Sequence, residues 1–217
     1  MANRVFKIEG CVVRAATFGR YVVLVLWFST GLGFLGISSC SRSGDDGDKN
    51  EVRKDSSLPV IKEAPFFSGI DQEGGALRSS QLLGKIWIAS FMFTSCQGVC
   101  PVMNGELQKV QKEFESFDIR FVSFTVDPET DSQQALAEYG KRYSADVRRW
   151  SFVRMNIDSV RSLSKNGFLL SDPFEPSAHS SRYVLVDKKN RIRGYYDCMD
   201  SVKVGELKRD IRILQQE

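Results

Sequence analysis

The fold and the chemistry of this chain both centre on one stretch, FMFTSCQGVCP, which runs from Phe91 to Pro101. Its apolar start ends in a polar turn that holds two thiols four residues apart, Cys96 and Cys100. Pro101 suits the first position of a helix, because its missing N–H would have no partner there. The order strand, cysteines, helix start predicts thiolate chemistry, since a helix N-terminus favours the thiolate and lowers the pKa of a thiol.

These two thiols allow three interpretations from the residues alone. They can bind a metal as thiolates, form a redox-active or structural disulfide, or stay inert and buried. His179, the only histidine, lies about 80 residues downstream, just ahead of another apolar run. It is either an ordinary surface or core residue or a third ligand. Two thiolates and one imidazole suit Cu(I), whereas zinc usually takes a fourth ligand.

Length and charge limit the classes of function. The 217 residues are enough for one domain and an appendage, and 42% hydrophobic and 26% charged residues are ordinary for a globular protein. The net charge of +3 arises within the first 40 residues, because basic and acidic residues cancel in the remainder. No basic surface for a nucleic acid is predicted.

The N-terminus is predicted to be a targeting segment. Residues 1–40 contain a basic region, an uncharged run over 21–37 and then Ile-Ser-Ser before Cys40. This order resembles a bacterial lipoprotein signal with Cys40 as the lipidation site, and the alternative is an uncleaved anchor helix. Either outcome places the rest of the chain on the extracytoplasmic face of a bacterial membrane. Residues 41–57 are expected to be a flexible tether, and 58–217 the folded domain.

Hydrophobic periodicity in the domain predicts an α/β fold, a mixed sheet with helices on both faces. The expected strands are a short pair within 66–79, then 86–93, 119–126, 150–155, 182–186 and 192–196, with a hairpin turn at 187–190. The expected helices cover 101–117, 158–165 and 202–214, with another that follows a capping box at 131–134.

Two further residues have open roles. Asp127 precedes a proline directly after an expected strand, so it is either a turn residue or a carboxylate that supports the cysteines from outside the ligand set. Cys198 has no obvious partner among the domain's three cysteines.

Four segments together resemble the Sco/SenC family, which is named for synthesis of cytochrome c oxidase. They are TSCQGVCP at 94–101, FVSFTVDPE at 121–129, HSSRYVLVD at 179–187 and RIRGYYD at 191–197. The resemblance covers roughly residues 60–217 and implies a thioredoxin-like fold. Two departures are Ser132-Gln133, where Thr-Pro is common, and Cys198, where a glycine is usual.

The resemblance also implies a function. Family members bind copper through both cysteines and a distal histidine, which places Cu(I) or Cu(II) at Cys96, Cys100 and His179. They help to build the binuclear copper centre of cytochrome c oxidase, so the expected partners are its copper-receiving subunit and, further, other copper chaperones or thioredoxin-like reductants. The alternatives are a thiol–disulfide oxidoreductase that uses Cys96 and Cys100 as a redox-active pair without a metal, and a structural lipoprotein that tolerates loss of all three residues.

Overall fold

A computed structural model describes residues 57–170 and 180–217. The predicted targeting segment with Cys40, almost all of the predicted tether, and His179 lie outside the described residues. Within the described part of the chain, no helix is both long enough and apolar enough to cross a membrane.

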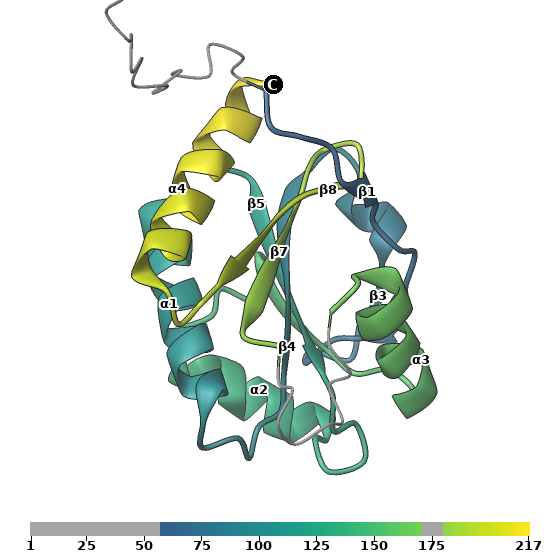
Figure 1. Cartoon of the computed structure of the whole chain (residues 1–217). Coiled ribbons are helices and arrows are strands. Elements are labelled where there is room, and N and C mark those ends of the chain that lie inside the picture. Colours follow the sequence, from purple (N-terminus) through teal and green to yellow (C-terminus); the bar gives the residue numbers. More distant parts are fainter. Residues whose placement is uncertain (1–56, 171–179) are drawn as a thin grey trace, which may run out of the picture. The chain divides into compact units, whose positions relative to one another are not determined.

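The centre of the fold is a six-stranded mixed sheet (Figure 1). Its order is β1 (Lys62–Glu63), β8 (Arg191–Asp197), β7 (Arg182–Val186), β4 (Ile86–Met92), β5 (Ile119–Thr125) and β6 (Trp150–Val153). Strands β4, β5 and β6 are parallel, and β7, β8 and β1 continue the sheet in antiparallel pairs.

Both faces of the sheet are covered, as the sequence predicts. Every residue of β4 is buried, and its alternate side chains enter two separate cores. One core contains side chains of α1 (Val99–Glu113), α2 (Gln133–Arg142) and α4 (Ser201–Gln216). The other contains side chains of α3 (Ile157–Ser162) and the π-helical turn η2 (Leu163–Gly167). Figure 1 shows α3 on the opposite side of the sheet from α1 and α4. Each fully buried large side chain stabilises the fold by about 1.5–3 kcal/mol.

A smaller unit lies beside this second core. It consists of the antiparallel pair β2 (Ser68–Ile70) and β3 (Ala76–Arg78), followed by the 3₁₀ turn η1 (Ser79–Leu82). The pair confirms the predicted short hairpin. Strand β1 was not predicted, because two residues are too few to show a periodicity.

The helix after the cysteines differs from its prediction at both ends. It begins at Val99, so Pro101 is its third residue rather than its first, and it ends at Glu113. Pro101 is tolerated because none of the first N–H groups of a helix has an intrahelical partner. Gly98, the residue before the helix, makes no side-chain cap, which explains why the sequence gives no start signal there. Phe117, predicted inside the helix, follows it and is 37% exposed.

Strand directions bring four segments to the same edge of the sheet, by which we mean the side where the carboxyl ends of β4 and β5 lie. Strands β4 and β5 end there in register, with Met92 opposite Thr125. Antiparallel β7 starts there and β8 ends there, with Arg182 opposite Asp197. The cysteine loop (residues 93–100, from the end of β4 into the first turn of α1) therefore shares this edge with the chain after β5, the chain before β7 and Cys198.

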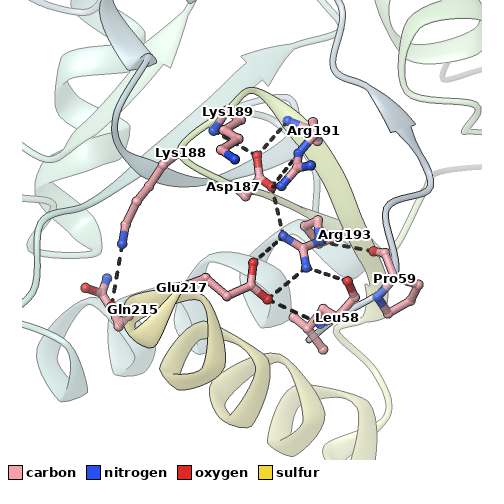
Figure 2. Close-up of polar contacts among 9 residues, drawn as sticks. All are labelled: Leu58, Pro59, Asp187, Lys188, Lys189, Arg191, Arg193, Gln215 and Glu217. Atoms are coloured by element: carbon pink, nitrogen blue, oxygen red, sulfur yellow. Dashed lines mark hydrogen bonds and ion pairs between the residues drawn. The ribbon is translucent and has the colours of Figure 1, made fainter. Parts of the chain in front are cut away.

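The opposite edge is closed by what we call the arginine clasp (Figure 2). Arg193, whose side chain is 2% exposed, donates to Asp187 and Glu217 at 2.8 and 2.7 Å through Nη1, and to Glu217 again at 2.9 Å through Nη2. It also donates to the backbone carbonyls of Pro59, at 3.1 Å, and Leu58. These bonds use all five guanidinium N–H groups and join the start of the described domain to the last residue of the chain.

Candidate metal centre

The cysteine loop leaves the buried strand β4 and turns directly into α1. Within it the backbone N–H of Cys96 donates to the carbonyl of Phe93 at 3.3 Å. Cys96 is half-buried, whereas Cys100 is 2% exposed and belongs to the core under α1. Both are free thiols, Cys96 packs against the core cluster that contains Cys100, and the two side chains are close enough to interact. The structure therefore brings the two predicted sulfurs into contact, one inside the protein and one at its surface.

The acidity of Cys100 differs from its prediction. Burial and the neighbouring thiol of Cys96 together raise the pKa of this thiol to about 12, while a backbone hydrogen bond with Phe93 acts in the opposite direction. The helix N-terminus was expected to lower this pKa, but desolvation of a thiolate in the apolar core dominates. In the absence of a metal, Cys100 is a protonated thiol at neutral pH.

Asn104, one turn after Cys100, fixes the start of α1. Its side chain is fully buried and donates through Nδ2 to the carbonyl of Cys100 at 2.9 Å and to the hydroxyl of Tyr139 at 3.0 Å. Because Tyr139 lies on α2, this amide joins the cysteine-bearing turn to the neighbouring helix.

A buried carboxylate, Asp131, holds the start of the cysteine loop. It is 0% exposed and accepts hydrogen bonds from the hydroxyl and the backbone N–H of Thr94, at 2.5 and 3.1 Å, and from the hydroxyl of Thr125 at 2.5 Å. The sequence interpretation placed Asp131 in the cap of α2, which is wrong: Ser132 is the cap, and its Oγ accepts from the N–H of Ala135 at 3.1 Å.

Asp131 could have been found from one signal. Two threonines and two carboxylates, Thr94 and Thr125 with Asp127 and Asp131, follow or end strands that were expected to be parallel neighbours, and such strand ends meet at one edge of a sheet.

Asp127, the predicted supporting carboxylate, is half-buried in the turn after β5. Its carboxylate accepts from the N–H of Thr130 at 3.4 Å, and its own N–H donates to the hydroxyl of Thr125 at 3.1 Å. These bonds correspond to the turn interpretation, and the carboxylate that reaches the cysteine loop is Asp131.

Cys198 lies closer to the cysteine loop than the sequence indicated. It is buried, at 4% exposed, and belongs to the same core cluster as Cys100. Its N–H donates to the carbonyl of Ser181 at 2.8 Å, at the start of β7. Burial and, to a smaller extent, the charge of Asp197 together raise the pKa of its thiol to about 12.

The structure places two of the three predicted metal ligands. His179 lies just before the second described range, which resumes at Ser180 on the edge that carries the cysteine loop. Among residues 57–170 and 180–217, no group of three His, Cys, Asp or Glu side chains could hold a metal ion. The described part of the site is thus a pair of thiols in contact.

Comparison with known proteins identifies the fold and the family. The SCO1/SenC family model matches residues 59–212. A SCO1 protein homologue of Bacillus subtilis is 26% identical over 161 residues, which cover 71% of this chain and 83% of the homologue.

Solved structures of the same family have this fold. A SCO1/SenC family lipoprotein from Bacillus anthracis superposes with a TM-score of 0.67 at 28% identity, covering 73% of this chain and 99% of that one. BsSco, described as a member of the Sco family of cytochrome c oxidase assembly proteins, gives 0.65 at 23% identity, covering 72% and 95%. ScoI of Arabidopsis thaliana, solved with copper bound, gives 0.56 at 23% identity, covering 69% and 98%. At 23% identity the last two are evidence of a common, thioredoxin-like fold.

Proposed function

Because this chain belongs to the SCO1/SenC family, we propose that it binds one copper ion through Cys96, Cys100 and His179 and delivers it to the copper-receiving subunit of cytochrome c oxidase. The observation that carries the proposal is the pair of free thiols in contact at the sheet edge where the chain resumes after His179. The printed descriptions of BsSco as an oxidase assembly protein and of ScoI as copper-bound support it by analogy.

The donor set of the cysteine loop fits copper as a cargo. Soft thiolate sulfur favours Cu(I). With an imidazole as the third donor, the site made of two thiolates and the copper ion would have only a small net charge with either Cu(I) or Cu(II). Cys100 holds its proton in the free protein, so binding must release that proton, and the apparent affinity rises with pH. Cys96, the half-buried sulfur, is the one from which an incoming partner can take the ion.

A partner would meet an apolar surface beside the thiols. Val102 on the first turn of α1, Met199 and Val202 are 42%, 61% and 66% exposed. Val102 and Met199 line one groove, and Cys198 forms part of its wall. Exposed apolar side chains of this kind suit contact with another protein.

The predicted membrane attachment agrees with this arrangement. Residues 1–40 would target the chain, with Cys40 lipidated, and 41–57 would tether the domain to the outer face of the membrane. The tether joins the domain at Leu58, which the arginine clasp holds at the edge opposite the cysteine loop. The thiols would then lie at the opposite end of the domain from the residue where the tether joins it. Mass spectrometry of the mature protein tests this attachment. An N-terminus with the mass of a lipidated Cys40 would support the lipoprotein, and an intact leader would support the uncleaved anchor helix instead.

The decisive experiment is a Cu(I) titration of the reduced protein under anaerobic conditions, in competition with a chromophoric chelator. We expect one equivalent in the wild type. The three single variants Cys96→Ser, Cys100→Ser and His179→Ala should bind by more than about 100-fold less tightly, because even a residue outside the ligand set contributes 10–100-fold. Cys198→Ser is the matched control and should bind as the wild type does. A His179→Ala protein with unchanged affinity and spectrum would refute the three-ligand site.

A second function, thiol–disulfide exchange, is favoured by the closeness of two free thiols in the cysteine loop. The Cys96 thiolate would attack a partner's disulfide, and Cys100 would then displace the partner's sulfur by attacking that of Cys96. The partner would leave with two thiols and this chain with a Cys96–Cys100 disulfide, which a thioredoxin-like reductant would reduce again. Because this chemistry needs no imidazole, exchange activity that survives His179→Ala while copper binding is lost would separate the two functions.

A further inference from the structure

We propose that Asp131 is a positioning residue for the Cys96–Cys100 pair: through Thr94 it holds the cysteine loop in the conformation that keeps the two sulfurs together. This inference deepens the proposed function and rests on it for copper, although it also applies to the thiol pair without a metal. Asp131 has no assigned role in the predictions from sequence beyond a helix cap, which the structure gives to Ser132.

The hydrogen bonds of Asp131 connect three segments at one point. Thr94 is the second residue of the cysteine loop, two residues before Cys96, and both its hydroxyl and its N–H donate to the carboxylate. Thr125 ends β5, opposite the last residue of β4, and donates to Oδ2 at 2.5 Å. Asp131 itself precedes the N-cap of α2. The carboxylate thus ties the cysteine loop to the adjacent strand and the adjacent helix.

The partners of Asp131 select a carboxylate in particular. In each of these hydrogen bonds with Thr94 and Thr125 the side chain of Asp131 is the acceptor, and an ionised carboxylate can only accept. The backbone N–H of Thr94 can only donate, and it lies 3.3 Å from Oδ1 and 3.1 Å from Oδ2 of Asp131. An asparagine in this place would turn its NH₂ group toward this N–H in either orientation of the amide, so one donor would face another.

Loss of the hydrogen bonds to Asp131 should change the position of the Cys96 sulfur relative to the Cys100 sulfur. The loop between β4 and α1 is short, and the internal bond from Cys96 to Phe93 is long, at 3.3 Å. Asp131 therefore accepts hydrogen bonds from the first half of the loop, while the side chain of Asn104 donates to the helical half. Releasing Thr94 lets Cys96 move relative to Cys100, whose position is set by the core.

The test compares Asp131→Asn with the wild type in the full-length protein in detergent, by two independent readouts. The first is Cu(I) affinity by chelator competition, which we expect to fall by about 10-fold to 100-fold. The second needs no metal: the dithiol–disulfide equilibrium of Cys96 and Cys100 in glutathione buffers, read by alkylation and mass. The disulfide should become about tenfold less favourable relative to the dithiol, because the two sulfurs are no longer held together.

Milder variants and a matched control separate positioning from stability. Thr94→Val removes one hydroxyl bond to Asp131 and should change both readouts in the same direction, whereas Thr94→Ser keeps the hydroxyl and should restore them. Ser90→Ala is the control: Ser90 makes a buried hydroxyl contact with Ser123 at 2.8 Å between the same two strands. It should lower the free energy of unfolding and leave both readouts within about twofold of the wild type.

Each outcome decides a different question. If Asp131→Asn and Thr94→Val keep the wild-type thiol equilibrium, the positioning role is refuted, whatever happens to copper. If Ser90→Ala shifts the equilibrium as far as they do, the effect is general destabilisation and the role is again refuted. If the wild type binds no copper but the thiol equilibrium shifts as expected, the proposed function fails and the positioning role stands.

Discussion

The two edges of the central sheet use polar groups in opposite ways. At the arginine clasp, a buried cation meets two carboxylates and two carbonyls, and all of its donors are used (Figure 2). At the cysteine loop, a buried carboxylate accepts from neutral donors, and the two thiols beyond it lie in the core or pack against it.

The difference indicates which edge is available for chemistry. A guanidinium with five bonds has no capacity left for a ligand, so the clasp can only hold the ends of the domain together. The thiols, by contrast, have lone pairs and a displaceable proton, so they keep the capacity to bind a ligand. Substitutions at the two edges should therefore affect different properties, and each prediction below tests that separation.

The largest effect is expected from Cys100→Ser, which should abolish tight copper binding. Serine has nearly the same shape as cysteine but offers a hard oxygen instead of a soft sulfur. Because Cys100 is buried in the apolar core, the new hydroxyl should also lower the free energy of unfolding by about 1–3 kcal/mol unless it finds a hydrogen-bond partner. Copper titration and urea unfolding on the same samples measure both. A Cys100→Ser protein that still binds copper tightly would remove the functional distinction between the edges.

Arg193→Met should produce the reverse pattern, with the next largest effect. Breaking a buried ion pair by removing one partner costs about 3–5 kcal/mol, and here it leaves Glu217 without its counter-charge and Asp187 with Arg191 alone. Copper affinity of the folded protein should be unchanged. The control is Arg148→Met, which removes an arginine that is 85% exposed and paired with Asp146. That surface pair should contribute at most about 1 kcal/mol. If urea unfolding showed the same loss of unfolding free energy for both substitutions, the arginine clasp would contribute no more than an exposed ion pair.

The sequence predicted the cysteine edge better than the clasp, for a physical reason. Strands β4 and β5 are short apolar runs, and α1 has apolar residues at helical spacing, so local patterns identify them. The edge that they share then follows from parallel strand directions. The clasp joins Leu58 to Arg193, which are 135 positions apart in sequence, and no local pattern indicates such a contact.

The errors at the cysteine edge have the same origin. The raised pKa of Cys100 depends on how deeply α1 buries its first turn, which the helix-terminus argument ignores. Asp131 resembles a capping residue locally, but its partners Thr94 and Thr125 come from two other strand ends. Cys198 looked isolated because the core that it shares with Cys100 forms only when β8 pairs with β7.

Alkylation should reveal the asymmetry within the thiol pair. Burial and a pKa of about 12 keep Cys100 protonated and shielded, and Cys198 is in the same state. With iodoacetamide at pH 7.5 and no metal, the half-buried Cys96 should react at least about tenfold faster than either, since the thiolate is the reactive form. Peptide mass mapping over time measures the three rates. If Cys100 reacted as fast as Cys96, its burial in the core of α1 would be wrong.

The smallest effect is expected at the rim of the clasp, from Glu217→Gln. The hydrogen bond from Arg193 lowers the pKa of Glu217 below its ordinary value of 4.5. Burial alone would raise the pKa of Asp187, but hydrogen bonds from Arg191 and Arg193 outweigh it and lower that pKa as well. A carboxyl with a lowered pKa stabilises the folded state above its unfolded pKa, and this stability is lost as the pH falls through the folded pKa.

The wild type should therefore lose unfolding free energy below about pH 4.5. Glu217→Gln should lose less over that range, starting from an unfolding free energy that is lower by about 1 kcal/mol at pH 7. Urea unfolding from pH 2.5 to 7 measures this slope. An identical slope in both proteins would mean that Glu217 adds nothing to the clasp, whose charge balance would then rest on Asp187 alone.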